Sequence, residues 1–508
     1  MVIFRRITQI VSLTAFSVLF LLAAYPLTSH FPVQFFLQLS SLNSVLTLLT
    51  ARAFLWTLLP GLVLLVLTFF LGRFFCGWIC PLGASIDYSD ALLHNKSKNN
   101  RKSKIHSWRR FKFYLLIAVS ICALFTVQIA GWFDPISIFT RTTVTVLYPL
   151  INWIITTLLN IFYSIGLFED TVFSFQDFLQ SWLLPITHMT FIGGFFIAFC
   201  FSVILLAGTI QKRFWCRNVC PLGALLGVSS LFRWHKRHVT DDCTNCGLCF
   251  RNCRMGAIRE DFKGTDHSEC INCMDCEAVC PVHAIHFGFF KKFAPSKVDF
   301  SKRAWMQSVF AGVTLSGLSQ IGYKNAVKND YRIRPPGAVP EDKFLDRCIR
   351  CGECIRVCST SGRGLQFTGI EFGWEGLGTP QLLTPQGYCE YNCNLCGQVC
   401  PTQAIQKLPL AEKQDTRMGT AHFDKTRCIP WYYGEDCLVC EEHCPLPDKA
   451  IKFVEKTVAT IDGQENTVKL PYVDESLCIG CGICTTSCPL IGKRGIYLTN
   501  ENENRRQA

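Results

Sequence analysis

The chain has 508 residues, more than one compact core normally holds, so two to four structural units are expected. Hydrophobic residues make up 49% and charged residues 17%, with a mean hydropathy of +0.25, which excludes an ordinary soluble protein and predicts that part of the chain lies in a bilayer. The 30 cysteines exceed chance in a chain too long for a small disulfide scaffold, and much of the +12 net charge lies beside apolar segments, which argues against nucleic-acid binding.

Four segments near the N-terminus are long and apolar enough to cross a membrane: residues 10–28, 53–71, 113–132 and 191–210. They predict a four-helix membrane unit. The loop 73–112 carries nine basic residues, whereas the loop 133–190 carries only Arg141. Because basic loops stay on the cytoplasmic side, the first loop is predicted inside and the second outside.

A possible fifth span, residues 142–168, is free of charge and long enough to cross. An internal repeat argues against it. Residues 73–84 read RFFCGWICPLGA and residues 213–224 read RFWCRNVCPLGA, identical at eight of twelve positions. Duplicated elements should face the same side, which requires an even number of crossings between them. We therefore expect residues 142–168 to lie in the interface or to re-enter.

The remaining cysteines from residue 243 onward form six groups of four with recurring spacing. The groups are Cys243, Cys246, Cys249 and Cys253; Cys270, Cys273, Cys276 and Cys280; Cys348, Cys351, Cys354 and Cys358; Cys389, Cys393, Cys396 and Cys400; Cys428, Cys437, Cys440 and Cys444; and Cys478, Cys481, Cys484 and Cys488.

The first two groups have the C-x2-C-x2-C-x3-C run of bacterial ferredoxins, in which three thiolates hold one [4Fe-4S] cluster and the fourth reaches the neighbouring cluster. By that logic Cys280 completes the first cluster and Cys253 the second. Zinc, the alternative, takes two cysteine pairs rather than a triplet with an offset fourth ligand. The spacing predicts six [4Fe-4S] clusters, a series that carries single electrons.

The two CxxxCP repeats carry Cys76, Cys80, Cys216 and Cys220, two thiols in each. Together the repeats would make an extra metal or redox site at the cytoplasmic face. Alternatively, the Pro-Leu-Gly turn ends a helix and the thiols only pack. Since none of the four predicted spans contains a histidine, no haem is expected.

Residues 301–321 begin with Ser-Lys-Arg and continue as a weakly apolar stretch, similar to a twin-arginine export signal with a lysine in place of the first arginine. This interpretation puts residues 323–508 outside the membrane. Lys324, Lys328, Arg332 and Arg334 just beyond favour the alternative of a cytoplasmic linker or surface helix.

With both CxxxCP motifs, the DPISIFTR loop (134–141) and the RIRPPGAVPEDKF (332–344) and RMGTAHFDKTRC (417–428) segments, the chain resembles a NapH-type membrane quinol dehydrogenase fused to a NapG-type ferredoxin, similar also to MauN and MauM. The resemblance implies quinol oxidation in the membrane unit and electron passage along the clusters to a periplasmic or membrane-associated reductase or cytochrome c. It also implies that, among the last four motifs, the two outer ones exchange their fourth cysteines and the two inner ones do the same. Cys488 would then complete the Cys348 cluster and Cys358 the Cys478 cluster. In the same way, Cys444 would complete the cluster of the fourth motif and Cys400 that of the fifth. Sequential pairing is the alternative.

For the quinol site we expect Asp134 as a proton acceptor and Arg141 as a group that polarises a quinone oxygen. Alternatively, Asp134 caps a turn and Arg141 anchors the interface. A redox sensor or maturation factor, a structural adaptor, and a carrier that serves a cytoplasmic ferredoxin partner are the other functions considered.

The predicted fold is an α-helical membrane bundle with four spans, possibly a fifth, plus α+β ferredoxin-like modules. The predicted units are a membrane unit (1–225), a two-cluster module (226–300), an apolar segment (301–335), a four-cluster domain (336–495) and a polar tail (496–508). The chain is predicted to be a multi-pass protein of the inner membrane, with residues 211–300 cytoplasmic and 323–508 periplasmic.

Overall fold

The computed structural model describes residues 1–27, 29, 31–93, 108–165, 169–182, 190–289, 301–326, 329–384, 386–459 and 465–506. Five of the nine basic residues of the loop 73–112 lie outside these described residues, as does the end of the predicted two-cluster module.

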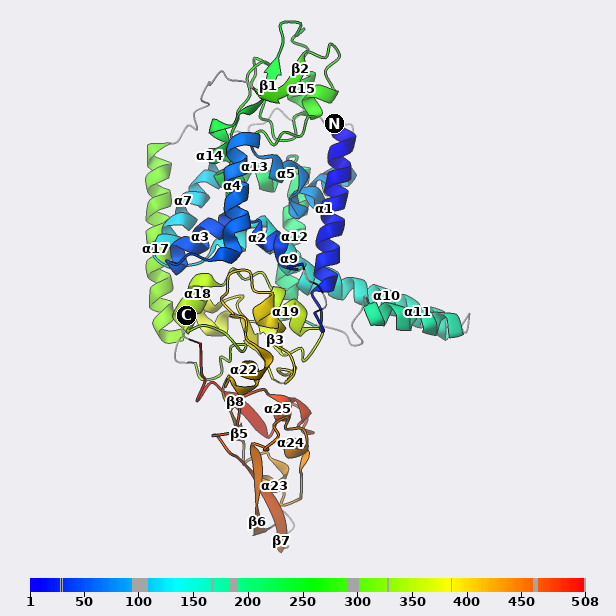
Figure 1. Ribbon diagram of the computed structural model, residues 1–508, viewed down its shortest axis with the longest axis vertical. Coiled ribbons are helices and arrows are strands. Elements are labelled where there is room, and N and C mark those ends of the chain that lie inside the picture. The colour runs from blue at the N-terminus through cyan, green and yellow to red at the C-terminus, as the bar shows by residue number, and fades with distance from the viewer. Residues whose placement is uncertain are drawn as a thin grey trace.

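The molecule is elongated, with a helical bundle between two cysteine-rich parts (Figure 1). The bundle helices are α1 (Val2–Leu22), α2 (Phe35–Gln38), α3 (Ser41–Ala51), α4 (Leu59–Leu71), α5 (Phe74–Trp78), α6 (Pro81–Leu93), α7 (Phe111–Leu124), α8 (Ala130–Phe133), α9 (Pro135–Thr142), α12 (Gly194–Leu206), α13 (Phe214–Asn218), α14 (Pro221–Ser229) and α17 (Lys302–Ala326). Helices α10 (Tyr148–Ser164) and α11 (Glu169–Trp182) project sideways from the bundle, across the direction of α1.

The first cysteine-rich part, beyond one end of the bundle, contains β1 (His235–Val239), α15 (Leu248–Asn252), α16 (Asp275–Ala278) and β2 (Ile285–Phe289). The second part, beyond the other end, contains α18 (Glu341–Arg347), α19 (Glu353–Cys358), β3 (Leu365–Phe367), α20 (Gly373–Gly376), β4 (Pro380–Leu382), α21 (Leu395–Gln398), α22 (Leu410–Asp415), β5 (Thr420–Phe423), α23 (Ile429–Tyr432), α24 (Val439–Glu442), β6 (Ile451–Ala459), β7 (Glu465–Val473), α25 (Ile483–Ser487) and β8 (Ile496–Thr499).

Antiparallel pairing brackets the cysteine motifs two at a time. Strands β1 and β2 pair from His235↔Phe289 to Val239↔Ile285 and enclose the first two motifs. A single bridge, Ala338↔Ile405, encloses the next two, and β5 pairs with β8 around the last two. The β6–β7 hairpin is inserted between the fifth and sixth motifs. The described chain therefore has three units of two motifs each, and each unit is closed by its own flanking segments.

The predicted four spans are not all found as long helices. Within the described residues, Val2–Leu22 and Pro135–Ser164 are the two helical segments with the length and apolar composition to cross a membrane. Helices α4, α7 and α12, which lie in the other three predicted spans, have 13, 14 and 13 residues. Four spans are thus not confirmed, and the first helix begins eight residues earlier than predicted.

The segment interpreted as an export signal or a linker forms α17, a helix of 25 residues that packs along α7. Its buried side carries small residues four apart: Ser308, Gly312 and Ser316. A Cβ on Gly312 would lie 2.9 Å from the carbonyl oxygen of Ala118 in α7, so the two backbones approach closely. Small residues at such spacing permit close packing of helices in a membrane.

Replacement of Gly312 by alanine should separate α17 from α7, because the added methyl group would meet the Ala118 carbonyl oxygen and the Cβ of the β-branched Ile121, neither of which can move aside freely. We expect G312A to lower stability by about 1–3 kcal/mol, the usual effect of overpacking. Gly317, in the same helix, has nothing within 4 Å of an added Cβ. G317A should therefore be neutral or stabilising, since alanine favours helix by about 1 kcal/mol. Thermal unfolding of the two variants in detergent tests the difference, and equal shifts would contradict this packing.

Candidate iron–sulfur centres

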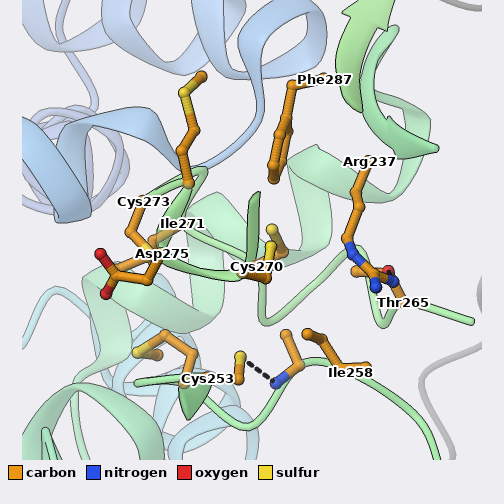
Figure 2. A pocket seen from close by; sticks show the side chains of 13 residues that line it. Arg237, Cys253, Ile258, Thr265, Cys270, Ile271, Cys273, Asp275 and Phe287 are labelled. Carbon is orange, nitrogen blue, oxygen red and sulfur yellow. Dashed lines mark hydrogen bonds between the residues drawn. The ribbon is translucent and has the colours of Figure 1, made fainter. Parts of the chain in front are cut away.

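The second motif of the first module lines a hollow together with one cysteine of the first motif. Cys270, Cys273 and Cys276 face it from one segment and Cys253 from another, as Figure 2 shows for Cys253, Cys270 and Cys273. This geometry agrees with the expectation that Cys253 completes the second set. Cys280 packs against the small apolar cluster that contains Cys249 of the first motif.

Hydrogen-bond donors reach the sulfur atoms of this module. The backbone N–H of Ala257 donates to Cys253 Sγ at 3.2 Å, and Arg237 Nη2 donates to Cys249 Sγ at 3.6 Å. Apolar side chains, among them Met255 and Ile271, line the rest of the hollow. Donors and an apolar surround are the two means by which a protein tunes the potential of an iron–sulfur cluster.

The second cysteine-rich part contains two further hollows of the same kind. One is lined by Cys358, Cys389, Cys393 and Cys396. The other is lined by Cys444, Cys478, Cys481 and Cys484.

The sets of the third and fifth motifs are assigned from the electrostatic interactions between their thiols. Cys400 interacts with Cys348, Cys351 and Cys354, and Cys488 interacts with Cys428 and Cys440. Motifs three and four therefore exchange their last cysteines, as do motifs five and six.

The outer-with-outer and inner-with-inner pairing implied by the resemblance is wrong for this structure. Cys358 lies with Cys389 rather than Cys478, and Cys444 lies with Cys478 rather than Cys389. The physical reason is the bracketing described above: the Ala338↔Ile405 bridge and the β5–β8 pair each join the chain before one motif to the chain after the next. Consecutive motifs are thus held against each other.

The sites of the second part adjoin one another. The backbone N–H of Cys389 donates to the carbonyl oxygen of Cys481 at 2.8 Å, so the ligand loops of two sets from different units are directly hydrogen-bonded. The four sets consequently form a continuous series, from the third motif beside the bundle to the fifth motif near the β6–β7 hairpin (Figure 1).

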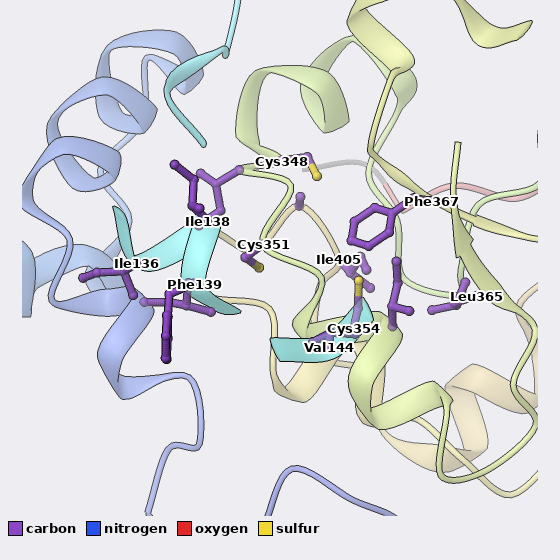
Figure 3. Packing of buried hydrophobic residues seen from close by; sticks show 14 of the residues in the cluster. Ile136, Ile138, Phe139, Val144, Cys348, Cys351, Cys354, Leu365, Phe367 and Ile405 are labelled. Atoms are coloured by element: carbon purple, nitrogen blue, oxygen red, sulfur yellow. The ribbon is translucent and has the colours of Figure 1, made fainter. Parts of the chain in front are cut away.

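The third motif packs directly on the bundle. Cys348, Cys351 and Cys354 belong to the same apolar cluster as Ile136 and Phe139 of α9, as Figure 3 shows.

At the same contact, Gly131 of α8 lies against the carbonyl group of Ile349, so close that a Cβ would overlap it. Arg350 donates to the carbonyl oxygen of Gln128. The cysteine loop and the helix ends therefore touch through backbone atoms.

The predicted quinol-site residues both lie at this contact. Asp134 caps α9: its carboxylate accepts from the Ser137 N–H at 2.8 Å and from Ser40 Oγ at 2.6 Å. Arg141 is buried, stacks on the ring of Trp132 at 4.5 Å and donates to the carbonyl oxygen of Arg350 at 3.3 Å. The structure thus gives Asp134 the capping geometry of the alternative interpretation and places Arg141 between the bundle and the third motif.

Two participants were missed in the sequence, Trp132 and Arg350. Trp132 also packs against Gly378 of the second part. Trp132 ends the third predicted span and resembles an ordinary interfacial aromatic residue. The available signal for Arg350 was its position inside the third motif, because it is the one basic residue in the x2 gaps of the six motifs.

The four CxxxCP cysteines come together inside the bundle. Cys80 interacts electrostatically with Cys76 and Cys216, and Cys220 with all three others. They lie at the bundle end that faces the first module.

Burial opposes ionisation of the thiols of the second part. It raises the pKa of Cys481 to about 12 and raises the pKa values of Cys354 and Cys396 well above the usual range. Because thiolates are the ligands, binding of iron must displace protons from these sites. Across the described part of the chain, no three His, Cys, Asp or Glu side chains converge as ligands of a single metal ion.

Models of 4Fe-4S binding domains match residues 53–100 and 193–239, 240–256 and 345–361, 265–286, and 470–496. These matches and the four-thiol hollows define the chain as a ferredoxin-type iron–sulfur protein.

Among curated proteins, the methylamine utilization ferredoxin-type protein MauM of Methylorubrum extorquens is 37% identical over 185 residues, which are 35% of this chain and 80% of MauM. The ferredoxin-type protein NapG of Escherichia coli is 32% identical over 204 residues, 38% of this chain and 84% of NapG. The chain belongs to this family of ferredoxin-type 4Fe-4S proteins, through its C-terminal part. No solved structure matches the chain.

The exchange of cysteines can be tested by double substitution. If Cys358 ligates with Cys389, the variants C358S and C389S damage the same cluster, so the double variant should lose about four iron atoms per chain, no more than either single variant. The combination C358S/C478S should instead lose about eight, because it damages two clusters. Iron and sulfide analysis of the anaerobically purified chain checks this, and the reverse pattern would restore the outer-with-outer pairing.

Proposed function

We propose that the chain is a membrane-bound quinol dehydrogenase whose 24 cysteines from residue 243 onward ligate six [4Fe-4S] clusters. Electrons taken from quinol in the bundle pass singly along the four clusters of the second part to a reductase or cytochrome c outside the membrane. The observation that carries the proposal is the direct contact of the third motif with α8 and α9, which joins a chain of cluster sites to an apolar bundle.

A belt of exposed large apolar side chains supports the membrane location. The outward faces of four helices contribute to it: Ile3, Ile7, Ile10 and Val11 of α1; Val63, Val66 and Phe70 of α4; Phe195, Phe196 and Phe199 of α12; and Phe310, Val313 and Leu318 of α17. In the first half of α1 the buried side carries Arg5, Gln9 and Ser12, and in the second half Phe16 and Phe20. Apolar residues outside and polar residues inside are the reverse of a soluble bundle and favour a lipid surround.

Helix α17 supports opposite locations for the two cysteine-rich parts. Its 25 residues span about 37 Å, enough for a hydrocarbon core of about 30 Å. Figure 1 shows it running along the bundle from the side of the first module to the side of the second. Arg73 and Lys112 of the basic loop both contact Glu269 of the first module, and by the positive-inside rule this supports a cytoplasmic location for the module.

The sideways projection of α10 and α11 supports an interfacial location for this hairpin. Exposed side chains of α10 include Trp153, Phe162 and Tyr163. Aromatic residues of this kind are enriched where a membrane meets water. An in-plane hairpin keeps the number of crossings between the two CxxxCP repeats even.

Unsatisfied polar atoms on α9 support a quinol site beside the third motif. Among the described residues, Thr140 Oγ1 and Arg141 Nε are buried and have no hydrogen-bond partner. A buried donor without a partner costs about 1–3 kcal/mol, which a quinone oxygen would relieve. The cationic guanidinium of Arg141 would favour developing negative charge on that oxygen. The carboxylate of Asp134, which already accepts from two donors, caps α9 and holds it in place.

Reduction of the clusters by a quinol analogue tests this function. In the anaerobic full-length chain in detergent, a reduced quinol analogue should bleach the visible absorption, and EPR should show reduced clusters. R141Q should slow this reduction at least tenfold, while dithionite should still reduce all clusters. R6Q, which changes an exposed arginine of α1, is the matched control. Clusters that accept electrons from dithionite but never from quinol would exclude quinol oxidation.

The sidedness has its own test. Two fusions after Ala508 test the location of the second part. Alkaline phosphatase, which folds only outside the cytoplasm, should be active, and a reporter that fluoresces only in the cytoplasm should show no fluorescence. The opposite result would place the second part inside and favour exchange with a cytoplasmic ferredoxin partner.

A further inference from the structure

We propose that Cys76, Cys80, Cys216 and Cys220 together hold one further iron–sulfur cluster, shared between the two CxxxCP repeats. This site is additional to the six clusters of the proposed function. Only the direction in which electrons cross it rests on that function.

Ligand number makes sharing necessary. A cubane or a two-iron cluster takes four thiolates, and each repeat supplies two. The matched 4Fe-4S domain model covers both repeats, residues 53–100 and 193–239, and leaves open how two incomplete halves bind. Direct contacts hold the halves together: Arg213 of the second repeat donates to the Cys76 carbonyl oxygen of the first at 2.8 Å, and Arg73 of the first lies against Gly223 of the second.

The two repeats interlock through their arginines. In the second repeat, a Cβ on Gly223 would lie 2.7 Å from Arg73 Nη2 of the first repeat, and 3.6 Å from Cys220 Sγ. In the first repeat, Gly83 lies beside Arg213 of the second, whose Nη2 donates to the Gly83 carbonyl oxygen at 3.3 Å. Each arginine therefore crosses to the Pro-Leu-Gly turn of the other repeat.

The turns also present donors to sulfur. The Gly83 N–H donates to Cys80 Sγ at 3.4 Å, and the Gly223 N–H donates to Cys220 Sγ at 3.3 Å, at the starts of α6 and α14. Both sulfur atoms accept in the same way, as pseudo-equivalent ligands of one group would. N–H groups at a helix start favour the thiolate that iron requires.

Arg73 provides the independent sign of a missing anion. Its side chain is fully buried; Nη1 donates to the Ser268 carbonyl oxygen and contacts Glu269, but Nε and Nη2 have no partner among the described residues. Arg213, its counterpart, is satisfied by Asp87 and by the Cys76 carbonyl oxygen. A thiolate-ligated cluster beside Cys220 would accept from the free edge of Arg73.

The site adjoins a cluster site of the first module. Gly77, between Cys76 and Cys80, packs against Ile271, between Cys270 and Cys273: an added Cβ would lie 2.7 Å from the Ile271 carbonyl oxygen. The two ligand loops thus meet without an intervening side chain. With both sites occupied, the two clusters would supply one-electron transfer between adjoining loops, the electron gained by one being lost by the other, with no change in the bonds to the protein.

Iron analysis of the anaerobic full-length chain tests the site. C80S and C220S should each lose the same iron, about two or about four atoms per chain for a two-iron or a four-iron cluster, and the double variant should lose no more. C200S, which removes an exposed cysteine of α12, should lose none. Mössbauer spectra of wild type and C80S should differ by one cluster component, which identifies the cluster type.

Three outcomes would overturn the shared cluster. The first is additive iron loss in the C80S/C220S double variant. The second is zinc rather than iron at this site in the wild-type chain, and the third is four free thiols at this site with the same iron content in the wild type and the variants. If the serine variants do not fold, wild-type iron above the roughly 24 atoms of six cubanes decides the question alone. Failure of the proposed function would give a different result. Quinol would not reduce the clusters, but the iron content would be unchanged, and this site would remain supported.

Discussion

An iron–sulfur cluster needs four thiolates around one body, and the structure never takes all four from one motif. The fourth cysteine always comes from the neighbouring motif in the sets that line the hollows. This exchange forces two motifs to fold against each other, and the antiparallel segments β1–β2, Ala338–Ile405 and β5–β8 hold them in that register. The division of the cysteine-rich parts into three units of two motifs agrees with that one requirement.

Buried ion pairs fix the first module to the bundle. Arg5 of α1 pairs with Asp275 at 2.9 Å, and Arg254 bridges Asp275 to Asp87 of α6, which also pairs with Arg213 at 2.7 Å. Removing one member of such a network leaves an uncompensated buried charge, which costs about 3–5 kcal/mol. The first module therefore cannot drift from the bundle without exposing these charges.

The cysteine positions could be predicted from the sequence because ligand spacing is a local property. The partner of each fourth cysteine could not, because Cys358 and Cys389 are brought together by a bridge between Ala338 and Ile405, which lie far apart in the chain. The pairing taken from the resemblance consequently failed, and the sequential alternative describes the structure.

The long helices divide in the same way. Helix α1 is long and apolar and lies in a predicted span, whereas α17 packs on α7 through small residues such as Gly312 and Ser316, which lower its mean hydropathy while allowing the close contact. Arg141 was singled out as the lone basic residue of its loop, yet its partners Trp132 and Arg350 come from a span end and a distant cysteine motif. Hydropathy and spacing carry no information about such contacts.

Because α17 joins the first module and the second cysteine-rich part in one polypeptide, the two are synthesised in equal number and never dissociate. A tethered partner has a fixed effective concentration, so the connection cannot be diluted or saturated as it would be between separate subunits. Regulation by changing the ratio of the two parts is therefore lost.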